Sequence, residues 1–287
     1  MVSSIRTVPV PGSRNCFGCD WVDAGQSLVP APPARIITLS ILFMTREVYP
    51  VTLSGASFRN PWHTWDMTIR FLGHSAFLLS ADGFTVLIDP FLSGNPVATV
   101  APDDLTPDVI ALTHGHADHV GDTVAIAKRT GACVVASFEI CNFFGEQGVQ
   151  TLEPGNPGGT IHVGDAHISF THAFHSSSYE GRYMGMPCGL VIRLGGKTFY
   201  HLGDTGLFGD LKLYGELYRP DVVAIPIGGR FTMDAALGTR AAELVGAPVA
   251  VPMHYRTFPL LAQTAEGFEP QGVRVAVLEP GEDLSVD

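Results

Sequence analysis

Three things are scarce in this sequence: cysteine, basic residues relative to acidic ones, and long apolar runs. The 287 residues include five cysteines, which are too few and odd in number for a disulfide framework, so we expect a reducing cytoplasm as the location. Lys and Arg number 17 against 28 Asp and Glu, and the net charge of −11 argues against nucleic acid as a partner. The longest apolar run, at 36–44, is too short to cross a membrane, and we expect no membrane association.

The composition and the hydrophobic pattern of the sequence change near residue 67. Residues 1–66 are rich in proline and show no sustained periodicity, so we interpret them as a disordered extension or as the product of a misassigned start. This segment holds a Cys16-x-x-Cys19 pair, which without a second pair is weak evidence for a metal or redox site. From Met67 onward, short β-rich runs alternate with turn residues, which predicts one compact domain over 67–287.

Strands and helices alternate within this domain. Helical patterns cover 118–128, 138–147 and 233–245, and each ends at a glycine. Nearly continuous apolar runs predict strands that are buried on both faces. These runs lie at 109–112, 133–136, 168–170, 190–194, 198–202, 222–227 and 249–251. The alternation predicts an α/β protein with layered packing.

The most informative segment is THGHADHV at 113–120, where an apolar strand gives way to a helix. His114 and His116 can direct both imidazoles to one point, while Asp118 and His119 face a neighbouring point. Imidazole and carboxylate ligands together favour zinc or another borderline divalent ion. Four metal-binding side chains in six residues at a strand end are improbable as a chance cluster. We therefore predict two metal ions side by side.

Further ligands are expected at the ends of other strands. His175, Asp204 and His254 each follow an apolar run, at positions that the sheet could bring together with the 113–120 segment. His172 and His201 precede two of these residues by three positions, and we assign them to packing. His74 follows the first strand in LGHS, and whether it lies near the metal ligands is left open.

The order of the candidate ligands along the chain, HxHxDH at 114–119 followed by His175, Asp204 and His254, resembles that of the metallo-β-lactamase superfamily. Within it, the sequence is similar to a family of bacterial and archaeal metal-dependent hydrolases related to the ascorbate-6-phosphate lactonases. The resemblance covers 67–287. It rests on DPFLSGN (89–95), THGHADHVGD (113–122), AFHSS (173–177), GMP (185–187), GDTGLFGD (203–210) and HYRTFP (254–259). It implies a four-layer αββα sandwich, the metallo-β-lactamase fold, with a binuclear site at one edge.

The resemblance also implies how the ligands divide. One metal would be held by His114, His116 and His175, the other by Asp118, His119 and His254, with Asp204 bridging. Related sequences place a Gly-His pair similar to that of His74 near the active site. The sequence departs from the family at Gly229 and Arg230, where relatives often carry an Asp-Asn-like pair. Arg230 is either a contact for an anionic substrate or a solvated loop charge.

The expected activity is hydrolysis of a small-molecule ester, lactone, amide or phosphodiester by a bridging hydroxide, with Asp118 as the orienting group and His74 as a second candidate catalytic residue. Two zinc ions, or manganese, would lower the pKa of the bound water. Loops at 92–107, 176–187 and 229–233 are expected to line the pocket. The mean hydropathy of +0.22 leaves room for surface that is buried in a homo-oligomer.

Three rival interpretations remain. An iron-dependent oxidoreductase, in particular a mononuclear iron dioxygenase, could use the same scaffold; diiron members resemble this pattern but tend to carry Glu in place of His116. A nuclease is disfavoured by the acidic domain. A metal-binding protein without catalysis has little support, because every expected ligand position is filled.

Overall fold

The structure is a computed structural model that describes residues 66–287. The interpretations of residues 1–66 as an extension and of the Cys16–Cys19 pair lie outside the described residues, Asp66 excepted. None of the helices within 66–287 combines the length and the apolar character that a membrane span requires.

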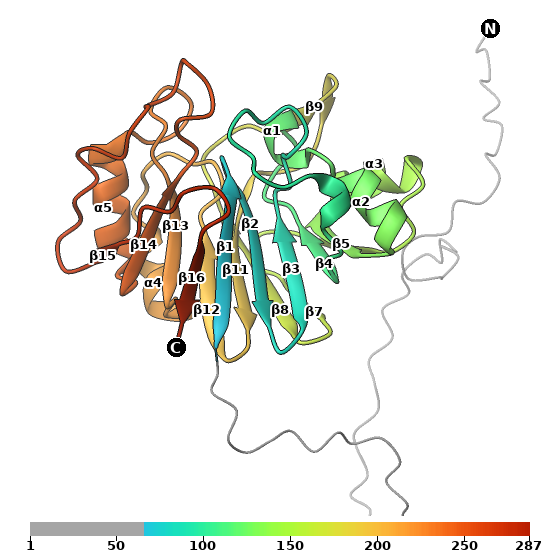
Figure 1. Ribbon diagram of the computed structural model, residues 1–287, viewed down its shortest axis with the longest axis horizontal. Coiled ribbons are helices and arrows are strands. Elements are labelled where there is room, and N and C mark those ends of the chain that lie inside the picture. The colour runs from blue at the N-terminus through green and yellow to red at the C-terminus, as the bar shows by residue number, and fades with distance from the viewer. Residues whose placement is uncertain (1–65) are drawn as a thin grey trace, which may run out of the picture. The chain divides into compact units, whose positions relative to one another are not determined.

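Two seven-stranded sheets pack face to face (Figure 1). The first contains, in spatial order, β16 (Asp283–Val286), β1 (Met67–Gly73), β2 (Ala76–Ala81), β3 (Phe84–Ile88), β4 (Val109–Ala111), β5 (Cys133–Ser137) and β6 (Leu152–Gly155). The second contains β15 (Arg274–Val275), β14 (Val249–Met253), β13 (Val222–Pro226), β12 (Lys197–His201), β11 (Cys188–Leu194), β8 (Ala166–His172) and β7 (Thr160–Val163). A separate short ribbon pairs β9 (Ser178–Tyr179) with β10 (Arg182–Tyr183).

Helices cover the outer faces of both sheets. In Figure 1, α2 (Thr123–Thr130) and α3 (Phe138–Glu146) lie on the side of the first sheet, and α4 (Leu211–Tyr218) and α5 (Ala235–Val245) lie on the side of the second. The short α1 (Ala117–Val120) and a 3₁₀ turn (Pro102–Asp104) complete the described elements. This arrangement confirms the four-layer αββα sandwich.

The apolar runs of the central strands follow from burial on both faces. In β4, Val109 and Ala111 face the core between the sheets, whereas Ile110 faces the layer of α2 and α3. In β13, Val222 and Ala224 face the same core, and Val223 contacts the layer of α4 and α5. Because both faces of these strands are covered, neither face requires polar residues.

The predicted helix over 118–128 is wrong as one continuous element. It is broken at Gly121, whose backbone has φ 43° and ψ −126°, so that α1 and α2 form two separate helices. A Cβ atom at Gly121 would lie 2.1 Å from the carbonyl oxygen of Pro90. The loop that follows β3 therefore passes directly against this point of the chain, and only glycine fits there.

Candidate metal centre

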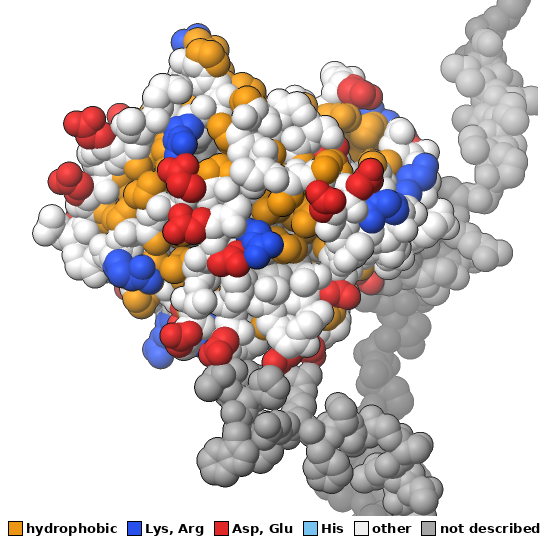
Figure 2. Space-filling view, in the orientation of Figure 1, with side chains coloured by type: hydrophobic (Ala, Val, Ile, Leu, Met, Phe, Trp, Pro, Cys, Tyr) orange, Lys and Arg blue, Asp and Glu red, His pale blue; other side chains and the backbone are white. Residues whose placement is uncertain are grey.

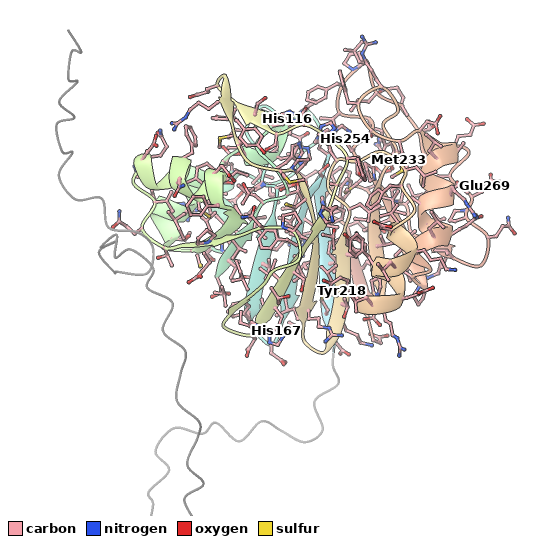
Figure 3. The ribbon with its side chains drawn as sticks, turned by 180° about the vertical axis from the view of Figure 1, so that it is seen from behind. His116, His167, Tyr218, Met233, His254 and Glu269 are labelled. Atoms are coloured by element: carbon pink, nitrogen blue, oxygen red, sulfur yellow. The ribbon has the colours of Figure 1, made fainter. Side chains whose placement is uncertain are left out.

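Every predicted ligand lies at the same edge of the sandwich. Strand pairing makes β1, β3 and β4 run in one direction in the first sheet, and β8, β12 and β14 run in one direction in the second. The carboxyl ends of parallel strands meet at one edge of each sheet. Figure 3 shows His116 and His254 at this edge and His167 and Tyr218 at the opposite one.

The first group of side chains consists of His114, His116 and His175, whose ring nitrogens lie within 4.8 Å of one another. His116 Nδ1 lies 3.0 Å from His114 Nε2 and 3.3 Å from His175 Nε2. Two nitrogens that bind the same tetrahedral zinc ion are roughly 3.3 Å apart, given bonds of about 2.0–2.1 Å. His114 is fully buried, whereas His116 and His175 are partly open to solvent.

The second group consists of Asp118, His119 and His254, together with His74. Asp118 Oδ2 lies 3.9 Å from His254 Nε2 and 3.1 Å from His74 Nε2. The two histidine rings of His74 and His254 pack with centroids 4.1 Å apart. Asp118 is the most exposed member, with 28% of its side chain open, so this carboxylate reaches the open side of the site.

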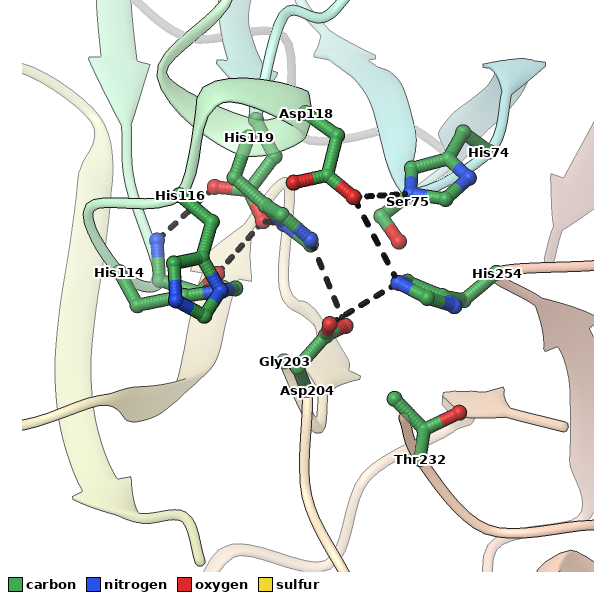
Figure 4. Close-up of polar contacts among 12 residues, drawn as sticks. His74, Ser75, His114, His116, Asp118, His119, Gly203, Asp204, Thr232 and His254 are labelled. Carbon is green, nitrogen blue, oxygen red and sulfur yellow. Dashed lines mark hydrogen bonds and ion pairs between the residues drawn. The ribbon is translucent and has the colours of Figure 1, made fainter. Parts of the chain in front are cut away.

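Asp204 lies between the two groups (Figure 4). Its Oδ2 is 2.9 Å from His254 Nε2 and 3.6 Å from His175 Nε2, so one oxygen contacts a member of each group. Its Oδ1 is 3.4 Å from His119 Nε2. Asp204 thus lies close to side chains of both groups.

The hydrogen bonds of Asp89 determine which nitrogen of two histidines is free. Asp89 Oδ2 accepts a hydrogen bond from His119 Nδ1 at 2.7 Å and one from the Thr113 hydroxyl at 2.6 Å. Because that hydroxyl proton is used, the Thr113 oxygen accepts from His114 Nδ1 at 3.0 Å. Both histidines therefore direct Nε2 into the site. Carboxylates commonly orient metal-binding histidines in this way.

His74 is oriented by a similar argument. Its Nε2 faces the Asp118 carboxylate, which can only accept, so Nε2 carries the proton and donates to Asp118. Nδ1 lies 2.9 Å from the Thr257 hydroxyl oxygen, whose single proton has two acceptors within reach, Nδ1 and the Tyr255 carbonyl at 3.2 Å. Burial, together with the nearby His254, lowers the pKa of His74 to about 4, which keeps the ring neutral. In this arrangement the His74 ring supports the Asp118 carboxylate.

Charge in the centre is concentrated on a few groups. Burial opposes ionisation of Asp204, but His254 and His119 outweigh it and hold the pKa of Asp204 well below its ordinary value. Burial also opposes a charge on His119, but Asp204 and Asp89 raise the pKa of His119 well above its ordinary value. Burial lowers the pKa of His114 and of His175, so their rings are neutral and offer lone pairs, as zinc requires.

Two buried polar atoms without a hydrogen bond indicate whether these residues suit a metal ion. His119 Nε2 and Asp204 Oδ1 are both buried and have no hydrogen-bond partner. Buried polar atoms are almost always satisfied, and unpaired ones indicate a missing ion or water. The nitrogen and oxygen donors that converge here match the ligand chemistry of zinc and similar ions. The residues therefore fit a divalent metal ion.

Backbone strain is concentrated in the same place. His74, Asp89 and His254 have left-handed backbones, with φ of 59°, 43° and 57°. Non-glycine residues adopt this conformation at a cost of about 1–3 kcal/mol each, and such residues cluster at functional sites. The strands that end at His74 and His254 are joined here, because the His254 amide donates to the His74 carbonyl at 2.7 Å.

Other residues singled out from the sequence lie elsewhere. His201 is buried and donates from Nε2 to the Ser75 carbonyl, while its Nδ1 accepts from the Gly203 amide. His172 is exposed, and its Nδ1 lies 2.7 Å from the Tyr214 hydroxyl. Neither joins a metal-binding group. Arg230 is exposed, with its guanidinium 5.7 Å from the Phe231 ring centroid.

Two site residues were missed as contributors at the sequence level. Asp89 directly follows an apolar strand, and this position could have identified it. The ends of such strands lie at the edge of the sheet where ligands usually bind. Thr257, in the segment after β14, carried no comparable signal. Both act through hydrogen bonds to residues far away in the chain.

Comparison with known proteins agrees with this geometry. The family model described as a beta-lactamase superfamily domain matches residues 68–254. A UPF0173 metal-dependent hydrolase from Carboxydothermus hydrogenoformans is 49% identical over 223 residues, which cover 75% of this chain and 98% of the relative. One from Geobacillus thermodenitrificans is 46% identical and covers 77% of this chain and 100% of the relative.

A solved structure shows the same relationship. Igni18, a metallo hydrolase from the archaeon Ignicoccus hospitalis, is 36% identical with a TM-score of 0.71, and the match covers 77% of this chain and 99% of that one. The family match, the fold and the cluster of His and Asp side chains all agree. The chain therefore belongs to the metallo-β-lactamase superfamily and is one of its metal-dependent hydrolases.

Proposed function

We propose that this hydrolase holds two divalent metal ions, zinc or manganese, and cleaves a small-molecule ester, lactone, amide or phosphodiester. His114, His116 and His175 would hold one ion, and Asp118, His119 and His254 the other, with Asp204 between them. The observation that carries the proposal is the position of Asp204, whose Oδ2 contacts His175 and His254 while its Oδ1 is buried, makes no hydrogen bond and faces His119 Nε2 at 3.4 Å.

When bound, the metal pair supplies hydroxide at neutral pH and polarises the oxygen of the scissile group. The remaining chemistry belongs to the chain. Asp118 orients the attacking oxygen from the open side of the site. His74, held by Thr257, donates a hydrogen bond to Asp118 and so fixes the direction in which that carboxylate points.

The hydrogen bond from His74 also affects the charge of Asp118. Burial raises the pKa of Asp118, but the bond from His74 and the nearby His119 outweigh burial and hold that pKa below its ordinary value. Asp118 is therefore ionised at neutral pH, as a base or an orienting acceptor must be. A neutral His74 supports this state without competing for metal.

A small-molecule substrate agrees with the distribution of charge. On the face shown in Figure 2, Lys and Arg side chains lie singly among Asp and Glu, without a continuous basic patch. Nucleic-acid backbones are bound by clustered basic side chains. A cytoplasmic location agrees with Cys133, Cys141 and Cys188, which are buried and free.

Metal-dependent turnover tests the proposal. The full chain, loaded with zinc or manganese, would be screened against activated esters, lactones, amides and phosphodiesters, beside His116→Ala and Asp204→Ala. We expect hydrolysis of at least one class, loss of activity with chelator, and a decrease of at least about 1,000-fold in both variants. His162→Ala, an exposed histidine away from the site, serves as the control. Full activity in either ligand variant would contradict the assignment.

A further inference from the structure

A cavity of about 750 Å³ opens directly beside the candidate metal centre. It is lined by the segment after β8 and by the turn after β10, and it includes His175 itself. A cavity of this size can enclose most of a drug-sized ligand. Of the three loops expected to line the pocket, residues within 176–187 do so, whereas 92–107 and 229–233 do not contribute to this cavity.

The open surface of the cavity is largely apolar. Phe174 and Tyr183 are each 67% exposed and Met186 is 49% exposed, and all three line it. Single exposed apolar side chains are common, but three that line one cavity next to a reactive centre indicate a binding surface for an apolar group.

Two of the serines that line the cavity contact the metal-binding turn. The Ser177 hydroxyl accepts a hydrogen bond from the Gly115 amide at 3.1 Å. The Ser176 hydroxyl lies 3.3 Å from His116 Nε2. These two hydroxyls contact the segment that carries His114 and His116 and so help to hold it in place.

Within 66–287, no Lys or Arg lines the cavity. The nearest arginine in the sequence, Arg182, is engaged outside it: both of its terminal nitrogens pair with the Glu146 carboxylate, at 2.6 and 3.1 Å. An anionic substituent that lies in the cavity, away from the metal ions, would therefore meet no Lys or Arg side chain, which is costly in a partly apolar site. The cavity is built for a neutral group.

We propose that this cavity receives a neutral apolar group, such as an acyl chain or aromatic ring, attached to the scissile carbonyl. The substrate is then an ester, lactone or amide whose acyl side is apolar. This inference rests on the proposed function, because the bond to be cleaved must reach the metals while its apolar substituent lies against Phe174, Tyr183 and Met186.

Two hydroxamates test the inference by binding alone. Acetohydroxamate and octanohydroxamate present the same metal-binding headgroup, and the second adds six methylene groups. Calorimetry on the zinc-loaded full chain would give both dissociation constants. Burial of a methylene group strengthens binding by about 4-fold, so a partly buried chain predicts an octano-to-aceto affinity ratio of at least about 100.

Matched variants locate the effect. Phe174→Ser and Met186→Ser should each reduce the ratio at least 5-fold while leaving the affinity for acetohydroxamate within 2-fold. Phe231→Ser is the control, because Phe231 is also exposed, at 54%, but does not line the cavity. Since all three side chains lie at the surface, the variants should fold, which circular dichroism checks.

Each other outcome overturns the inference in a different way. Equal affinity for the two probes overturns the inference alone, whereas binding of neither probe overturns the proposed metal site as well. Tighter binding of phenyl phosphate than of benzohydroxamate, lost in Arg230→Met, would assign an anionic substrate. A native dimer that Phe174→Ser dissociates in sedimentation, with the affinity ratio unchanged, would assign this surface to a second copy of the chain.

Discussion

The Asp89 carboxylate accepts a hydrogen bond from His119 Nδ1 over 2.7 Å, and both side chains are fully buried. The same oxygen accepts from Thr113, whose hydroxyl oxygen contacts His114. One carboxylate thus fixes the orientation of a histidine in each of the two groups. Asp89 does not belong to either group of possible metal ligands. Its contribution is therefore to position His119 and His114.

Replacement of this carboxylate should weaken metal binding without removing a ligand. In Asp89→Asn, the amide has one acceptor oxygen, so its NH₂ group faces either the Thr113 backbone amide at the Oδ1 position or the His119 and Thr113 hydroxyl donors at the Oδ2 position, and the orientation of the two rings is weakened. We expect zinc affinity to fall by about 10- to 100-fold, measured by competition with a chromophoric chelator. Asp108→Asn is the control, because the Asp108 carboxylate is exposed and accepts hydrogen bonds from Thr85. Unchanged affinity in Asp89→Asn would contradict the positional role.

The variant His74→Asn should separate catalysis from metal binding. Asparagine tolerates the left-handed backbone of this position, which has φ 59°, so the fold should be retained. Asp118 would lose the hydrogen bond that orients it, and we expect kcat to fall by about 10- to 1,000-fold on the best substrate while metal content stays unchanged. Loss of one metal ion would instead identify His74 as a ligand, and full activity would leave it without a role.

Gly121→Ala should destabilise the protein strongly. The new Cβ would meet the Pro90 carbonyl at 2.1 Å, in a backbone conformation that alanine rarely adopts. We expect the free energy of unfolding of the metal-free protein to fall by about 2 kcal/mol or more, measured with denaturant. Gly131→Ala is a matched comparison, because Gly131 also has a positive φ, 78°, but no atom lies within 4 Å of its Cβ position. Equal losses in the two variants would show that the contact with Pro90 does not matter.

His201 should make stability depend on pH. Burial lowers the pKa of His201 below the ordinary value of 6.5, and both ring nitrogens are already paired in the neutral form. The unfolded chain therefore binds a proton that the folded chain does not, and stability falls as pH drops below 6.5, by at most about 1.4 kcal/mol per pH unit.

The matching variant is His201→Gln, which can keep a donor and an acceptor without titrating. Denaturant unfolding of the metal-free protein between pH 7 and pH 5 should show a shallower decline in the variant than in the native chain. An identical slope in both proteins would mean that His201 does not contribute to acid sensitivity.

The ligand-bearing part of the site could be predicted from sequence because its signals are local. His114, His116, Asp118 and His119 fall within one turn, and the other candidate ligands each close an apolar run. Strand direction then brings these ends to one edge. The orienting contacts could not be predicted, because Asp89 and His119 are 30 residues apart and Thr257 and His74 are 183 apart.

Helix α4 was missed for a physical reason. Gly215 lies in its middle, and glycine disfavours helix interiors by about 1 kcal/mol relative to alanine. A Cβ there would lie 2.0 Å from the carbonyl oxygen of Val245, at the end of α5. The close packing of α4 against the end of α5 thus requires glycine at position 215. In the sequence alone, the same glycine indicates that no helix forms there.

The central claim is that the chain binds two metal ions, one in each group, with Asp204 between them. The most direct measurement is the metal content per chain, by plasma mass spectrometry, of the full-length protein purified without added metal, beside His116→Ala and Asp204→Ala. We predict close to two zinc or manganese ions in the native chain and a lower content in each variant. One iron ion per chain would redirect the account to oxygen chemistry, and no bound metal in the native chain would contradict it.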